Sequence, residues 1–455
     1  MFIRPANWAK MTPGERRAAR LKSWIEADKN FATPEIAADY RQRTRRVADL
    51  ISLKKPDRVP CMPQIGGFIT SHAGVTPYEA MYDYDKLKMA FWKFFEDFSP
   101  EYNVFTGSFN PGPVFDKLDY KVYSWPGHGL PHDRSIQTIE KEFMEAGEYD
   151  DLIADPEAYY LRTYMPRVFG ALGPLAILPS LYSTVELPAV PLLFVPIGLP
   201  EVQKAFETML EAGREALRWA MAMGEIDARV FRERGVPLVC GGFTKAPFDF
   251  LGDTLRSTMG IMMDKFRRPK QLLAAVERLT PTAIGIGVKT ATDGDNPFVF
   301  IPMHKGADGY LSDKDFKTFY WPTFKATLLG LIQEGLIPYN YVEGSYNERL
   351  DVITDPDIPP GSIYWVFDKT NLKEVKKRFQ GWAAFGAGLP ASLLFTGTRE
   401  QVEAWIRDAI ENLGYDGGMA IGTGVVVEHA TAENMRAMFE ATERYGSYGT
   451  SAGAA

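Results

Sequence analysis

Three short apolar runs within residues 296–368 constrain the fold of this chain more than any other feature. Each run ends on a side chain capable of chemistry, and these side chains are His304, Glu343 and Asp368. A helical pattern of apolar residues fills each gap between the runs. Because parallel strands need a long crossover that a helix usually supplies, this alternation predicts parallel strands joined by helices.

The same alternation continues on both sides of this stretch. Further strand candidates lie at 59–65, 102–107, 236–240, 382–385 and 419–421, with helical patterns between them. We therefore predict an α/β fold, a (β/α)8 TIM barrel over residues 58–446. A helical N-terminal extension at 1–57 precedes it, and a disordered tail at 447–455 follows. Side chains just past the strand ends of such a barrel converge on one mouth, so His304, Glu343 and Asp368 are expected to share a pocket.

Composition narrows the functional classes. The 455 residues include 45% hydrophobic and 24% charged residues, which is typical of a globular protein with a large core. A net charge of -7 gives no basic surface for nucleic acid. The two cysteines form neither a disulfide framework nor a zinc motif, and the N-terminus lacks a secretion signal. These features predict a cytoplasmic protein.

Residues 169–200 form an unusually apolar stretch that six prolines interrupt. Prolines at this frequency prevent a continuous membrane-spanning helix, so we expect no membrane insertion. We expect a buried irregular segment or an interface here. A hydrophobic lid over an apolar substrate and a superficial contact with a membrane are the alternatives.

Several motifs resemble the uroporphyrinogen decarboxylase superfamily. They are Gly422-Thr-Gly-Val, Thr431-Ala-Glu-Asn-Met-Arg-Ala-Met, Thr396-Gly-Thr-Arg-Glu-Gln-Val and Ser312-Asp-Lys-Asp-Phe-Lys. The superfamily contains porphyrinogen decarboxylases and zinc-dependent corrinoid methyltransferases. The resemblance covers roughly residues 58–445 and implies a TIM barrel, and the methyltransferase branch is the more similar of the two.

The sequence departs from the superfamily at two places that bear on the reaction. The stretch 62–70 has no arginine, whereas decarboxylase members use an arginine-rich motif there to hold substrate carboxylates. We therefore expect no decarboxylation of porphyrinogens. In the methyltransferase members, thiolates bind zinc at positions that match Glu343 and Thr423 here.

Oxygen and nitrogen ligands could replace those thiolates. His304 and Glu343 could bind zinc or another divalent ion as a Lewis acid. Without a metal, Glu343 and Asp368 placed close together would share a proton and act as acid and base. The structural alternatives are a Glu343–Arg349 ion pair and helix capping by Asp368 and by Asp253.

Other residues are candidates for contact with the substrate. Aromatic residues near the predicted mouth favour an apolar or aromatic substrate, for example a phenolic or methoxylated ring. The predicted substrate-binding residues are Gln64, His72, Asp249, Tyr310, Tyr341 and Trp365.

The resemblance implies a methyltransferase component of a corrinoid-dependent system, with cobalamin carried by a partner protein and with zinc as a possible metal. A cofactor-free decarboxylase or lyase acting on a small carboxylated substrate is the first alternative. A non-catalytic barrel that binds a ligand or a partner is the second, and a homo-oligomer is possible in each case.

Overall fold

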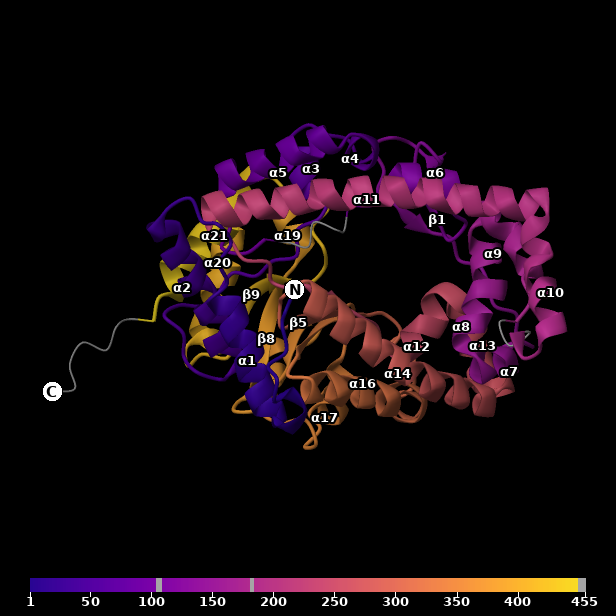
Figure 1. Ribbon diagram of the computed structural model, residues 1–455. Helices are drawn as coiled ribbons and strands as arrows, with labels where there is room; N and C mark the ends of the chain where they lie inside the picture. The colour runs from indigo at the N-terminus through magenta and orange to yellow at the C-terminus, as the bar shows by residue number, and fades with distance from the viewer. Residues whose placement is uncertain (104–108, 181–183, 449–455) are drawn as a thin grey trace.

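The computed structural model describes residues 1–103, 109–180 and 184–448. A parallel sheet of six strands in the order β4-β5-β6-β7-β8-β9 lies at its centre (Figure 1). Sequential strands are therefore spatial neighbours, as the alternation of strands and helices predicts. The strands are β4 (Gly242–Phe243), β5 (Phe298–Met303), β6 (Ile337–Val342), β7 (Tyr364–Phe367), β8 (Ala384–Leu389) and β9 (Met419–Thr423).

Helices connect each strand to the next and cover the outside of the sheet. Both faces of β6 to β9 are buried, which explains why their sequences read as continuous apolar runs rather than as alternating ones. The connecting helices are α12 (Pro247–Phe250), α13 (Ser257–Arg267), α14 (Pro269–Asp293), α15 (Asp313–Asp315), α16 (Trp321–Gln333), α17 (Leu350–Ile353), α18 (Leu372–Phe379), α19 (Ala391–Thr396), α20 (Arg399–Ala409) and α21 (Ala432–Gly446).

Two further segments extend the sheet by isolated bridges. Cys61 pairs in parallel with Ile421 of β9, and Asn103 pairs in parallel with Leu238, just before β4. Met62 and Tyr102 share one apolar cluster with residues of β5 to β9. Among the residues described, no pairing joins the 59–65 segment to residue 103. The structure thus shows a parallel β/α sheet, and closure into a barrel stays a prediction.

Two predicted strands differ from the observed ones. Among the described residues, the strand expected at 236–240 contributes only the bridge at Leu238, and the regular pairing begins later, at Gly242. Most of the strand expected at 102–107 lies outside the described residues.

The N-terminal residues form helices that pack on the amino end of the sheet. These are α1 (Pro13–Ile25) and α2 (Pro34–Ile51), which begin at the capping residues Thr12 and Thr33. The Trp24 ring meets the ring of Phe298, the first residue of β5, with centroids 5.4 Å apart. The Arg20 guanidinium donates to the Glu334 carbonyl at 2.8 Å. The extension therefore covers one end of the strands.

An arm of mostly helical segments projects from the sheet. Figure 1 shows the long helix α11 (Pro200–Arg234) running from the far end of this arm back over the sheet. At 1.5 Å per residue its 35 residues measure about 52 Å. The remaining elements outside the sheet are α3 (Phe68–His72), α4 (Pro77–Tyr82), α5 (Tyr84–Phe98), α6 (Gly112–Leu118), β1 (Tyr123–Pro126), β2 (Gly129–Leu130), β3 (Gln137–Thr138), α7 (Tyr149–Ala154), α8 (Pro156–Tyr159), α9 (Met165–Val168) and α10 (Val190–Phe194).

The apolar stretch near α10 is exposed, which corrects the expectation of a buried segment. Val185 is 79% exposed and Leu187 is 83% exposed, and Leu192, Phe194 and Val195 are also more than half exposed. In Figure 1, α10 lies at the end of the arm away from the sheet, so the segment does not cover the strand ends as a lid. Among the described residues, no single helix is long and apolar enough to cross a membrane. The bent pair Leu187–Gly198 and Pro200–Arg234 reaches that length and apolarity with a 74° break.

Candidate active site

Charged side chains gather where the central strands end. His304 directly follows β5, Glu343 directly follows β6, and Asp368 directly follows β7. Lys245 lies two residues beyond β4. Parallel neighbours place their carboxyl ends at one edge, so these residues surround a common mouth.

Asp253 is the centre of the cluster at this mouth. Its Oδ2 lies 2.7 Å from His304 Nδ1 and 2.5 Å from Lys245 Nζ. Its Oδ1 lies 3.4 Å from Lys305 Nζ. The Asp253 side chain is only 10% exposed, so the three cationic groups share a carboxylate that is largely removed from water.

A second carboxylate, that of Asp249, holds the turn that carries His304. Asp249 is fully buried in α12, and it accepts the backbone N–H groups of His304 at 3.3 Å and of Lys305 at 2.9 Å. The Tyr320 hydroxyl also donates to it, at 2.8 Å. These three bonds fix the backbone after β5 and thereby the direction of the imidazole.

The protonation of the three central groups follows from their surroundings. Burial opposes the ionised form of Asp253, but the hydrogen bond and charge of His304 and the charge of Lys245 outweigh it, so the pKa of Asp253 is lowered. Burial also opposes the charged form of His304, but the hydrogen bond and charge of Asp253 prevail, and the pKa of His304 is raised. Burial and the nearby Asp253 charge raise the pKa of Asp249.

Glu343 faces the other nitrogen of the imidazole. Its Oε2 lies 4.0 Å from His304 Nε2, and its side chain is 45% exposed. The alternative of an ion pair between Glu343 and Arg349 is wrong, because the fully buried Arg349 is directed toward Asp308 and Asp313 and donates to the Leu311 carbonyl. Glu343 is therefore open to the mouth.

Asp368 supports the loop after β6 rather than the helix after β7. Its Oδ2 accepts the backbone N–H of Gly344 at 3.2 Å. The side chain that caps α18 is Asn371, which accepts the N–H of Lys373 at 3.0 Å. The helix-cap interpretation is thus wrong for Asp368. It is also wrong for Asp253, whose carboxylate binds His304 and Lys245 instead.

The predicted substrate-binding residues fall in different places. Tyr341 and Trp365 are buried within the sheet, and the Gln64 amide donates to Tyr339 on its inner face at 3.1 Å. His72 lies on α3, where its Nε2 is 2.7 Å from Asp97. Tyr310 is exposed at the rim of the cluster, with the Lys305 ammonium 5.5 Å from its ring centroid.

An apolar cavity of about 210 Å³ lies beside the ends of the 59–65 segment and β9. Its walls include Met81, Phe109, Ile136 and Val426, and Glu428 is among its polar residues. A volume of this order accommodates a small ring, although its position at Gly66 and Val426 is distinct from the His304 cluster.

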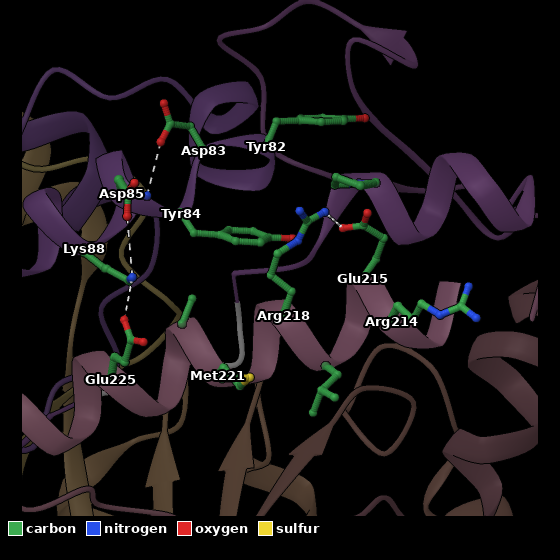
Figure 2. Close-up of a pocket in the computed structure, with 13 residues that line it drawn as sticks. Tyr82, Asp83, Tyr84, Asp85, Lys88, Arg214, Glu215, Arg218, Met221 and Glu225 are labelled. Carbon is green, nitrogen blue, oxygen red and sulfur yellow. Dashed lines mark hydrogen bonds and ion pairs between the residues drawn. The ribbon is translucent and has the colours of Figure 1, made fainter. Parts of the chain in front are cut away.

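A larger cavity, of about 640 Å³, lies between α11 and the α4–α5 turn (Figure 2). Lys88 bridges Glu225 of α11 at 2.5 Å and Asp85 at 3.5 Å, and Arg218 pairs with Glu215. Of these pairs, Lys88–Glu225 joins α5 to α11, whereas the other two lie within one helix each. The Lys88–Glu225 pair therefore helps to attach α11 to α5.

The zinc site implied by the sequence resemblance does not fit the residues at the mouth. His304 and Glu343 supply two ligands, and the Nδ1 contact to Asp253 is typical of a ligating histidine. Within residues 1–103, 109–180 and 184–448, however, no group of three or more His, Cys, Asp or Glu side chains could hold a metal ion. Cys61 and Cys240 are buried in the interior.

Comparison with solved structures identifies a likeness of fold to a methyltransferase. The chain is similar to a methyltransferase from Methanosarcina mazei. The TM-score is 0.56 at 14% sequence identity, and the match covers 89% of this chain and 98% of that one. No family model and no curated protein matches the sequence.

Sequence reasoning did not identify three residues of the cluster as functional. Lys245 and Lys305 were not singled out, and Asp253 was interpreted as a helix cap. The sequence contains one indication of the role of Lys245, because this residue follows an apolar strand candidate and a pair of glycines. The contact between Asp253 and His304 spans 51 residues and depends on the tertiary fold.

Proposed function

We propose that this chain is a methyltransferase of the uroporphyrinogen decarboxylase superfamily. In this proposal, it removes a methyl group from a small methoxylated aromatic molecule and passes it to a corrinoid carried by a partner protein. The observation that carries the proposal is a charged cluster with a histidine open to the mouth, on a fold similar to that of a methyltransferase. A closed eight-stranded barrel and a homo-oligomer belong to the same proposal.

The chemistry assigned to this chain is protonation of the leaving oxygen. The corrinoid of the partner protein, in its Co(I) state, would supply the nucleophile to which the methyl group is transferred. The aryl oxygen keeps the electron pair of the broken carbon–oxygen bond and takes a proton from His304 Nε2. Asp253 favours the charged imidazole, so His304 is suited to act as a general acid. Water or a buffer acid then restores the proton.

The neighbouring groups have supporting roles. Glu343, 4.0 Å from His304 Nε2, can accept a hydrogen bond from the substrate or from the imidazole. The Lys245 and Lys305 ammonium groups stabilise negative charge that develops at the mouth.

The test is an anaerobic assay with free cob(I)alamin as the methyl acceptor and a panel of methoxybenzenes, with the phenol product measured by chromatography. The wild-type protein should release phenol. His304→Gln should lower the rate by about 10²–10⁴-fold, the usual contribution of a general acid. Glu343→Gln should lower it by a smaller factor with little change in melting temperature.

His429→Gln is the matched control, because His429 is an exposed histidine after β9, with its ring centroid 5.8 Å from that of Phe395. It should retain wild-type turnover. Absence of phenol from the whole panel with folded wild-type protein would contradict the proposal, as would full activity of His304→Gln.

The cations also favour a second candidate function, that of a lyase acting on a carboxylated substrate. Lys245, Lys305 and His304 could hold a carboxylate while a carbon–carbon bond breaks. Release of CO₂ from a panel of aromatic carboxylic acids without cobalamin would support this function over methyl transfer.

A further inference from the structure

The cluster around Asp253 has more hydrogen-bond donors than acceptors. Two ammonium groups and one imidazole lie within 3.4 Å of this single carboxylate. Among the described residues, Asp253 is the only carboxylate within ion-pair distance of Lys245 or Lys305. Buried charges are normally paired and hydrogen-bonded, so such a cluster favours an additional anion.

Lys305 shows the imbalance most clearly. Its side chain is only 13% exposed, and its Nζ lies 3.4 Å from Asp253 Oδ1. Within the described part of the chain, no hydrogen bond from this ammonium is present, although it carries three donors. The centroid of the exposed Tyr310 ring lies 5.5 Å from this ammonium. The ammonium therefore points to a place where an acceptor from a ligand can bind.

The other acidic residues do not balance these cations. Asp249 accepts bonds from the backbone of residues 304 and 305 and from the Tyr320 hydroxyl, so its acceptor atoms are already engaged. Glu343 approaches only His304, at 4.0 Å. Lys245 and Lys305 also approach different oxygens of Asp253, which places them on either side of that carboxylate.

We infer that the substrate carries a carboxylate, which Lys245 and Lys305 bind while the rest of the molecule lies toward Tyr310 and His304. A carboxylate has two oxygens, one for each ammonium. This inference rests on the proposed function and deepens it, because it identifies the substrate class as aromatic methyl ethers that bear an acid group.

Calorimetric titration with 4-methoxybenzoate and its neutral isostere 4-methoxybenzamide tests the inference. The wild-type protein should bind the acid at least tenfold more tightly than the amide. Lys305→Met and Lys245→Met should each remove most of that preference while leaving affinity for the amide unchanged. Lys317→Met, which loses an exposed pair with Asp313, should behave as wild type.

Equal binding of acid and amide by wild-type protein would overturn the inference, as would a preference that survives both lysine substitutions. Binding of inorganic phosphate as tightly as the acid would overturn the assignment to a carboxylate. Circular dichroism establishes that each variant is folded.

The two proposals fail in different ways. Methyl transfer from neutral methoxybenzenes without any preference for acids would remove the inference and leave the proposed function. Selective binding of acids without methyl transfer would remove the proposed function and leave the inference.

Discussion

Asp253 controls the electrostatics of the mouth because one carboxylate serves three cationic partners. Its hydrogen bond and charge outweigh the burial of His304 and keep the pKa of that imidazole raised. Such a pair stabilises the fold most at pH values below about 6.5, the ordinary pKa of histidine. This stabilisation is lost as the pH rises through the raised pKa of the folded state.

We predict that Asp253→Asn lowers the pKa of His304 below that of a solvent-exposed histidine. Burial, the largest influence on this pKa, lowers it, and so does the Lys245 charge. The substitution removes the hydrogen bond and charge of Asp253, so that only the Asp249 charge remains to raise the pKa. Titration of ¹³C-labelled histidine by NMR would measure the change, and the five histidines of the chain give few signals.

Asp97→Asn is the control for this titration, because Asp97 lies 2.7 Å from His72 in a similar pair. It should leave the His304 titration unchanged. A His304 pKa that is the same in wild type and Asp253→Asn would show that the pair does not operate as described.

At the level of elements, the sequence predicted the strands whose position depends on a local pattern of apolar residues. The strands that end on His304, Glu343 and Asp368 were predicted correctly, because each is a short apolar run followed by a polar residue. The aromatic residues assigned to the mouth were less predictable. The structure buries four aromatic residues of β6 and β7, namely Tyr339, Tyr341, Tyr364 and Trp365. A strand that is covered on both faces has no alternation of apolar and polar residues, so its sequence does not distinguish core side chains from those at the mouth.

The contacts of the N-terminal helices also lay beyond the sequence pattern. The sequence of an amphipathic helix predicts which face is apolar, but it does not predict which surface packs against that face. The structure shows that Trp24 of α1 packs on Phe298, at the start of β5.

We predict that Trp24→Ala lowers the free energy of unfolding by ~3–5 kcal/mol, because it leaves a cavity between α1 and the amino end of the sheet. Urea denaturation would measure the loss. Lys22→Ala on the same helix is the control, since Lys22 is exposed and a surface change of this kind costs less than about 0.5 kcal/mol. Similar stability of the two variants would contradict the packing of Trp24.

At the scale of the whole molecule, the segment at 185–199 exposes apolar side chains that the fold and the proposed site do not explain. Contiguous apolar patches of this kind usually mark an interface. The sequence has no lysine or arginine between Arg167 and Lys204, and it has two acidic residues, Glu186 and Glu201. Anionic lipid surfaces attract helices rich in lysine and arginine, and this segment carries acidic residues instead. Its charge therefore favours contact with a second copy of this chain over contact with a membrane.

We predict that the purified protein is a dimer by light scattering and that the double substitution Leu187→Glu and Phe194→Glu converts it to a monomer. Identical surfaces meet in a two-fold dimer, so each substitution places charge on both sides of the contact. Phe266→Glu, at an exposed site on α13, should leave the dimer intact. A monomeric wild type would contradict the assignment, and binding to vesicles would favour lipid instead.

The helices α1 and α2 close the amino end of the sheet, where Trp24, Leu50 and Ile51 pack with Phe298 and Ile337. Under the proposed function, substrate and product therefore share the carboxyl end of the sheet, where His304, Glu343 and Asp368 lie. A product that dissociates slowly from this end of the sheet would delay binding of the next substrate.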